Sequence, residues 1–126
     1  IDPHHPKTVY AATLKGLYKT TDFGDSWKRI AESLPDQFFS DLVLNSQQPD
    51  VLYVTSRQGI HKSMDGGKTW QAINEGLTNL NIRALTISIK DPQILYTGTN
   101  LKGLFRSRNG GQSWQHVPLT SATPPT

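Results

Sequence analysis

One eight-residue phrase occurs three times in this chain, at residues 20–27, 63–70 and 107–114. Its copies read TTDFGDSW, SMDGGKTW and SRNGGQSW, and each ends on a tryptophan. Trp27, Trp70 and Trp114 are 43 and then 44 residues apart, and a constant spacing in this range indicates a repeat architecture. The sequence therefore predicts successive copies of one structural unit.

The repeated unit is longer than this phrase. A proline, a tyrosine and a glycine recur once per unit, and these residues are Pro6, Pro49, Pro92, Tyr10, Tyr53, Tyr96, Gly16, Gly59 and Gly103. Between them lie short runs rich in Val, Ile, Tyr, Phe and Thr, separated by Pro-Asp, Asp-Pro and Gly-Gly pairs. Such runs and pairs are typical of strands and turns, and four strands in about 43 residues are typical of a β-propeller blade.

The strand pattern predicts an all-β chain. The predicted strands are 8–13, 16–20 and 27–30 in the first unit, 39–44, 51–56, 59–63 and 69–73 in the second, and 82–89, 94–98, 103–107 and 113–117 in the third. Aligning Pro6 with Pro49 places Ile1 opposite the last residue of the second unit's first strand. We therefore expect three four-stranded antiparallel blades, the first lacking its inner strand, with the phrase forming the turn between strands three and four of each.

The unit boundaries follow from the same alignment. We expect a partial propeller over 1–117 and a disordered tail, rich in Pro and Thr, at 118–126. The predicted blades are 1–36, 37–79 and 80–117. Residues 31–36 are the one segment where we expect that a short helical turn can form. Of the adjacent Phe38 and Phe39, one is expected to enter the core and the other to face solvent or a neighbour.

Composition excludes several function classes. The formal net charge of +3 is compatible with an anionic partner, but it is far below that of a typical nucleic-acid-binding domain. Cysteine is absent, so the chain has no disulfide or thiolate site. No apolar run is long enough to span a membrane, and no signal peptide is visible. Because the first residue is isoleucine rather than methionine, we expect the chain to have been processed, trimmed or excised.

Each phrase has the composition of a tight turn followed by an anchoring aromatic ring. Asp and Asn side chains accept hydrogen bonds from nearby backbone N–H groups, glycine takes positive φ, and tryptophan can bury a large ring. Carboxylates near a turn are also candidate Ca²⁺ ligands, but Asn109 replaces the aspartate in the third copy and would weaken a cation site. We therefore interpret the following residues as structural: Thr20, Asp22, Gly24, Trp27, Ser63, Asp65, Gly67, Trp70, Ser107, Asn109, Gly111 and Trp114.

The phrase resembles the Asp-box, or BNR repeat, Ser/Thr-x-Asp-x-Gly-x-Thr-Trp, and the residues around it are similar to those of Asp-box β-propellers. That group includes sialidases, xyloglucan-active glycoside hydrolases, sortilin-type receptors and the photosystem II assembly factor. The resemblance covers residues 1–117, implies three consecutive propeller repeats, and favours an extracytoplasmic or secreted location. It says little about function, because function depends on sites grafted onto a fold.

Catalytic chemistry is poorly represented in the chain. Glycoside hydrolysis needs two carboxylates that flank the scissile bond. Asp41 lies in a predicted first strand, which lines the channel of a propeller, and there it could act as an acid or base or pair with Arg83. The arginines do not assemble the triad that sialidase-like families use. The four histidines have no metal-ligand spacing, so neither a metal site nor a cofactor is expected.

The surface that differs between repeats is the best candidate for binding. In a propeller, the loops joining strands two and three and the loops joining successive blades open on the face opposite the phrase turns. Lys15, Arg57 and Lys102 have nearly equivalent loop positions and can form a basic arc that suits an acidic protein surface or an anionic glycan. The candidate ligand-binding residues are Lys15, Arg57, Gln58, Asn100, Lys102, Arg83 and Asp41.

These observations favour a non-enzymatic propeller scaffold that binds a protein or glycan through those loops. Two alternatives stay open. One is part of a glycoside hydrolase, sialidase-like or xyloglucanase-like, and the other is an excised or engineered repeat fragment with no independent function. Because the first blade lacks its inner strand and both end blades expose a flank, we expect the chain to pair with itself as two halves of a six-blade ring, or with the remaining blades of a parent protein.

Overall fold

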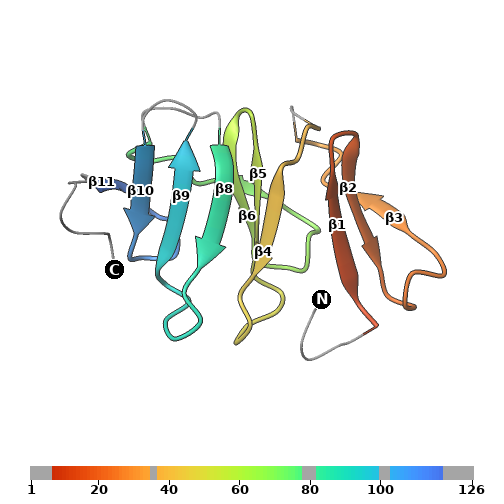
Figure 1. Cartoon of the computed structure of the whole chain (residues 1–126). Coiled ribbons are helices and arrows are strands. Elements are labelled where there is room, and N and C mark those ends of the chain that lie inside the picture. The colour runs from red at the N-terminus through yellow and green to blue at the C-terminus, as the bar shows by residue number, and fades with distance from the viewer. Residues whose placement is uncertain (1–6, 35–36, 78–81, 100–102, 118–126) are drawn as a thin grey trace.

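The computed structural model describes residues 7–34, 37–77, 82–99 and 103–117. Within these ranges every regular element is a β-strand, and the strands form three antiparallel sheets that lie side by side (Figure 1). We call these sheets, with their turns, blade one, blade two and blade three in chain order. Among the described residues, no helix has the length and apolar character that crossing a membrane requires.

Each blade is a meander in which every strand pairs with the next one along the chain. Blade one has three strands, β1 (Val9–Thr13), β2 (Gly16–Thr20) and β3 (Lys28–Ile30). Blade two has four, β4 (Asp41–Leu44), β5 (Leu52–Ser56), β6 (Gly59–Ser63) and β7 (Gln71–Ala72). Blade three also has four, β8 (Ile82–Ile87), β9 (Leu95–Thr99), β10 (Gly103–Ser107) and β11 (Gln115–Val117). The all-β prediction is confirmed, including the blade that is one strand short.

The register shows which strand blade one lacks. Tyr10 on β1 pairs with Lys19 on β2, as Tyr53 on β5 pairs with Lys62 on β6. Strand β1 is therefore the counterpart of β5, the second strand of blade two. Packing between blades agrees, because β1 contacts β4 just as β5 contacts β8. Among the described residues, blade one thus has no counterpart of the inner strands β4 and β8.

The connections fall on two ends of the sheets, as Figure 1 shows. The tight β1–β2 and β5–β6 turns lie at one end, and the turns after β2, β4, β6, β8 and β10 lie at the other. Residues 31–34 form a turn in which Leu34 N donates to Ala31 O at 3.2 Å, and the rest of the segment expected to allow a helical turn lies outside the described residues. The tail at 118–126, predicted to be disordered, also lies outside them.

The apolar core is divided between the two seams where blades meet. One cluster joins blades one and two and contains Leu17, Ala31, Phe39 and Val54, with Trp70 packed against it. The other cluster joins blades two and three and contains Val51, Tyr53, Ile60, Ile73, Ile82, Leu85, Leu95, Phe105 and Trp114. Phe39 is buried and Phe38 is exposed, as expected for adjacent residues in extended backbone. Each blade therefore depends on its neighbour for burial.

Candidate functional site

The three phrases form the same kind of turn, which we call the Asp-box-like turn (20–27, 63–70 and 107–114). In blade two, the hydroxyl of Ser63 donates to Asp65 Oδ1 at 2.8 Å and accepts from Gly67 N at 2.9 Å. Asp65 Oδ1 also accepts from Thr69 N at 2.9 Å. Equivalent bonds join Thr20, Asp22, Gly24 and Ser26 in blade one, and Ser107, Asn109, Gly111 and Ser113 in blade three. The Ser, Thr, Asp and Asn side chains named here are therefore used inside the turn.

Hydrogen bonding holds Asp22 and Asp65 in their charged form. The hydroxyl of Ser26, followed by that of Thr20, lowers the pKa of Asp22 to about 2. The hydroxyl and N–H of Thr69, followed by the hydroxyl of Ser63, lower the pKa of Asp65 to about 2. A catalytic general acid needs a raised pKa, so neither carboxylate is suited to that role.

The Asp-box-like turns of blades two and three are each also bonded to the blade before them. Gly66 O, in the turn of blade two, accepts from Lys19 Nζ at 3.1 Å and from the hydroxyl of Tyr10 at 3.4 Å. Lys19 Nζ lies 5.2 Å from the centroid of the Tyr10 ring. At the next seam, Gly110 O accepts from Lys62 and Tyr53 in the same way, at 3.1 and 3.3 Å. A tyrosine and a lysine of one blade thus bind a turn carbonyl of the next.

The tryptophans complete these seams to different degrees. Trp114 is 3% exposed, and its indole N–H donates to Ile73 O of blade two at 2.7 Å. Trp70 is partly buried against blade one, and its indole N–H donates to Gly67 O at 3.1 Å. Trp27, with no preceding blade among the described residues, is 46% exposed. The burial of this ring therefore depends on a neighbouring blade.

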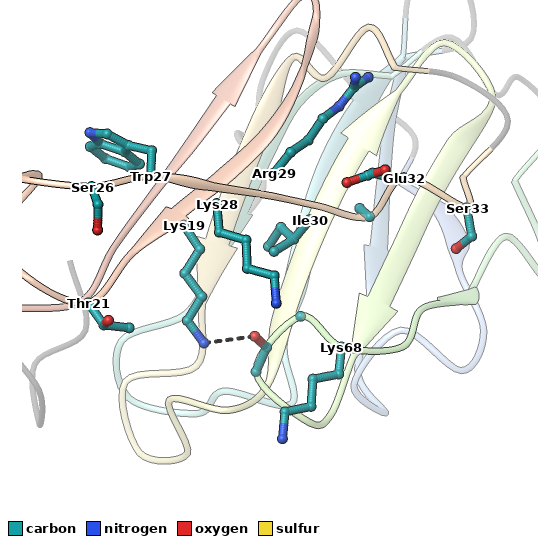
Figure 2. Close-up of a pocket in the computed structure, with 13 residues that line it drawn as sticks. Lys19, Thr21, Ser26, Trp27, Lys28, Arg29, Ile30, Glu32, Ser33 and Lys68 are labelled. Carbon is teal, nitrogen blue, oxygen red and sulfur yellow. Dashed lines mark hydrogen bonds between the residues drawn. The ribbon is translucent and has the colours of Figure 1, made fainter.

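A basic groove lies at the seam between blades one and two, as Figure 2 shows. We call it the basic groove: a cavity of about 610 Å³ between β3 and the turn of blade two, lined by Lys19, Thr21, Ser26, Trp27, Lys28, Arg29, Ile30, Ala31, Glu32, Ser33, Gly66, Gly67 and Lys68. Four of these residues are cations, and Glu32 is the acidic one. Ile30 supplies an apolar wall.

The cations of the basic groove differ in whether they are hydrogen-bonded within the chain. Lys19 is engaged with Gly66 O. Arg29 points away from Lys28, as alternation along a strand requires, and donates to Gln37 Oε1 at 3.0 Å (Figure 2). The ammonium groups of Lys28 and Lys68 are exposed and have no hydrogen-bond or ion-pair partner among the described residues. These two are the groups available to a ligand.

The repeat supplies an internal comparison for this groove. The equivalent cavity between blades two and three has a volume of about 730 Å³ and contains Lys62 and Glu75. There Gln71 occupies the position of Lys28, Gln112 that of Lys68, and Ala72 that of Arg29. Because the fold is the same at both seams, the positive charge belongs to the first groove and is not a requirement of the blade.

The loop residues predicted to bind a ligand are described in part. Lys15 and Gln58 are exposed in the β1–β2 and β5–β6 turns, at the same end of the sheets. Beside Gln58, the guanidinium carbon of Arg57 lies 3.9 Å from the centroid of the exposed Phe38 ring. Asn100 and Lys102 lie outside the described residues, and so does the side chain of Arg83. The basic arc expected from Lys15, Arg57 and Lys102 therefore stays a prediction.

Asp41 lies beside a third cavity of about 540 Å³, which is lined by Tyr10, Ala12, Ser40, Asp41, Leu42, Val43, Leu44 and Ile87. Its Oδ1 accepts from Leu42 N at 2.9 Å and its Oδ2 accepts from Leu85 N at 3.2 Å. The carboxylate thereby joins β4 to β8. In each of the three cavities, one acidic residue is found among the described lining residues, whereas a glycosidase site needs two.

The described histidines do not form a metal site. His61 is buried, and burial lowers the pKa of its imidazole. The imidazole of His116 packs edge-on against Phe105, with ring centroids 5.3 Å apart. Among the described residues, no group of three or more His, Cys, Asp or Glu side chains could hold a metal ion. His4 and His5 lie outside them.

The basic groove was missed at the level of sequence, although a signal for it was present. Lys28 and Lys68 are separated by most of a repeat, and only the seam brings them together. A position-by-position comparison of the repeats would have shown lysine at both places where the next unit has glutamine.

Comparison with solved structures identifies the class of fold. The chain is similar to an ancestral GH74 enzyme, with a TM-score of 0.78 and 22% identity over 91% of this chain and 17% of that one. It is also similar to the GH74 xyloglucanase of Xanthomonas campestris, with a TM-score of 0.74 and 18% identity over 98% of this chain and 23% of that one. A third similar structure is YCF48 bound to a D1 peptide, with a TM-score of 0.67 and 18% identity over 86% of this chain and 36% of that one.

These structures are β-propellers, and the chain is a partial β-propeller. It spans between about a sixth and about a third of the length of the propellers it matches. At such low identity the likeness establishes the fold alone. No protein-family model matches the chain, and no curated protein sequence does either.

Proposed function

We propose that this propeller segment is an interaction module whose basic groove binds an acidic segment of a partner protein. The observation that carries the proposal is the pair Lys28 and Lys68, two uncompensated ammonium groups on facing sides of one cavity. Their counterparts at the next seam are glutamines. Ile30 gives the groove an apolar wall against which a peptide can pack.

One of the comparisons supports a protein partner. YCF48 shares the fold and was solved with a peptide bound to it. The GH74 enzymes share the same fold, but the cavities described in this chain do not contain the carboxylate pair that glycoside hydrolysis requires. We also infer that the repeats are Asp-box blades, because the phrase residues bond to one another in the same pattern in all three.

Fluorescence anisotropy with a fluorescein-labelled peptide of alternating Glu and Ala tests the proposal. The double variant Lys28→Gln/Lys68→Gln copies the neutral groove of the next seam. Because an exposed ion pair contributes about 0.2–1 kcal/mol, this variant should bind the peptide roughly tenfold more weakly at low salt. Lys90→Gln, which removes an exposed lysine on the β8–β9 turn, is the matched control and should leave binding unchanged.

The reverse substitution sharpens the test. Gln71→Lys/Gln112→Lys should give the second groove the cations of the first and raise the number of peptides bound per chain. If Lys90→Gln lowered the affinity for the acidic peptide as much as Lys28→Gln/Lys68→Gln does, the binding would be nonspecific charge attraction, and this would contradict the proposal. A sulfated oligosaccharide that competes at lower concentration than the peptide would favour a glycan instead.

A further inference from the structure

Strand β3 is the outer strand of blade one, and within the described residues it pairs with β2 and with no other strand. The register shows which of its backbone groups face away from β2. In blade two, Ile73 N donates to Ile60 O at 3.0 Å, so that pair is hydrogen-bonded and the neighbouring pair, which contains Ala72, is not. Arg29 holds the place of Ala72 in blade one, opposite Tyr18. The N–H and C=O of Arg29 therefore point outward, and we call this row of backbone groups the β3 edge.

The β3 edge runs along the basic groove. The groove is lined by eight consecutive residues, 26–33, which include the whole of β3 and its flanks. Both walls of the groove belong to blades one and two of this chain, so its shape needs no further blade. A strand edge with unpaired N–H and C=O groups is a template on which an extended chain can pair. The groove thus has the form of a slot for one extended segment.

The corresponding edge at the second seam is less suited to this use. Strand β7 is two residues long, Gln71–Ala72, and carries no charge. The segment that follows it is bonded to the next blade, because Glu75 O accepts from Trp114 N at 2.7 Å. The β3 edge, in contrast, belongs to a three-residue strand that carries two cations. The two seams therefore differ in backbone as well as in charge.

The charges along β3 select the occupant of this edge. Lys28 and Arg29 are both exposed, and as neighbours in a strand they lie on opposite faces. An added strand therefore meets a cation on each of its faces, with Lys68 on the other wall of the groove. Opposite charges across a strand pair are stabilising, whereas like charges directly opposite are destabilising. A second copy paired antiparallel about Arg29 would set two guanidinium groups against each other, so the edge favours an acidic chain over its own copy.

We propose that the acidic segment binds the basic groove as an extended strand added to the β3 edge. This inference rests on the proposed function and adds the mode of recognition. The N–H and C=O of Arg29 bond to the backbone of the partner, while Lys28 and Lys68 hold its carboxylates. An antiparallel strand bonds to Arg29 through the residue directly opposite, and a parallel strand through the two residues on either side of that one. In both cases only every second backbone N–H of the partner faces β3.

Backbone N-methylation of the fluorescein-labelled Glu-Ala peptide tests this mode without changing any charge. One peptide is methylated on every Ala nitrogen and another on every Glu nitrogen. Because only one of the two sets faces β3, one peptide should bind at least about tenfold more weakly and the other should bind like the unmodified peptide. With the Glu side chains facing Lys28, loss on Ala methylation indicates an antiparallel strand, and loss on Glu methylation indicates a parallel one.

Arg29→Pro and Arg29→Ala form a matched pair on the protein side. Both remove the cation and its hydrogen bond to Gln37, but proline alone also removes the outward N–H. Proline is tolerated on an edge strand where the N–H faces away from the sheet. Arg29→Pro should therefore bind the unmodified peptide about threefold to tenfold more weakly than Arg29→Ala. Near-UV circular dichroism verifies that both variants are folded.

The outcomes separate this inference from the proposed function. Equal affinity of the two methylated peptides would overturn strand addition, and if Lys28→Gln/Lys68→Gln still weakened binding, the proposed function would stand. If the unmodified peptide did not bind, the proposed function would be wrong, and this inference with it. Self-association in sedimentation velocity that Arg29→Pro abolishes and Arg29→Ala does not would show that a second copy occupies the edge, which would also overturn the inference.

Discussion

The hydroxyl of Tyr53 donates a hydrogen bond of 3.3 Å to Gly110 O and so joins the second strand of blade two to the turn of blade three. Lys62 Nζ donates to the same oxygen at 3.1 Å. One turn carbonyl thus collects two donors from the neighbouring blade. The burial that this contact brings raises the pKa of Tyr53 and lowers the pKa of Lys62.

Because Gly110 O has two donors, removing them should be non-additive. Tyr53→Phe should lower the free energy of unfolding by about 0.5–1.5 kcal/mol, the usual net contribution of a hydrogen bond. The double variant with Lys62→Met should lose more than the sum of the single variants, because the buried carbonyl then has no donor left. Urea denaturation of the four proteins in the cycle measures this, with Tyr18→Phe as the control. Strict additivity would contradict the shared-acceptor interpretation.

The three tryptophans should differ in their contribution to stability. Trp114→Phe removes a buried ring and the hydrogen bond to Ile73 O, so we expect a loss of about 1–3 kcal/mol. Trp27→Phe should change the monomer by less than about 0.5 kcal/mol, because this ring is largely in solvent. Trp70→Phe should fall between them. Thermal unfolding of dilute protein ranks the three variants by the stability they lose. Equal losses of stability at all three positions would exclude this account of the seams.

Gly76 and Gly98 should respond in opposite directions to alanine. A Cβ on Gly76 would approach Trp114 O closely, and its φ of 94° is unfavourable for other residues. Gly76→Ala should therefore cost more than about 2 kcal/mol, by strain and by displacement of the Trp114 backbone. Gly98 has nothing within 4 Å of its added Cβ, so Gly98→Ala should be neutral or stabilise by up to about 1 kcal/mol. Denaturant midpoints decide between these outcomes.

Acid should weaken the Asp-box-like turns. The pKa of Asp65 falls from 3.8 to about 2 on folding, so its contribution is complete above about pH 4 and is lost as the pH falls toward 2. Asp65→Asn should remove that part of the pH dependence while keeping the turn, since Asn109 makes the same turn in blade three. Asp65→Ala should lower the melting temperature at neutral pH. If the stability of the Asp65→Asn protein fell with decreasing pH as steeply as that of the wild-type chain, the Asp65 carboxylate would not change its pKa on folding.

His61 predicts a second pH-dependent loss of stability. Burial lowers its pKa below 6.5 in the folded chain, so the unfolded chain binds a proton first as the pH falls. Stability from this group is complete above about pH 6.5 and is lost below it. His61→Phe, which copies Phe105 at the equivalent position, should flatten the stability profile between pH 7 and pH 5. Melting temperatures across this interval test the prediction.

Much of the fold could be predicted from the sequence because strands and turns depend on local residue order. The period of Tyr10, Tyr53 and Tyr96 located the second strand of each blade, and the missing inner strand of blade one followed from it. The Asp-box-like turns were equally predictable, because each is closed by bonds between residues at most four positions apart.

Which residues meet at the seams between blades depends on the tertiary structure alone. Lys28 and Lys68 line one groove because β3 and the next turn meet there, and nothing in the residues between them specifies that meeting. The same packing determines that Trp114 is buried and Trp27 is exposed, although each ends a copy of the same repeated phrase. Local sequence determines the shape of each blade through the order of its strands and the short-range hydrogen bonds of its turns. The partners of its two flanks depend on which blades pack beside it, because burial and electrostatic contact require surfaces from distant parts of the chain or from another chain.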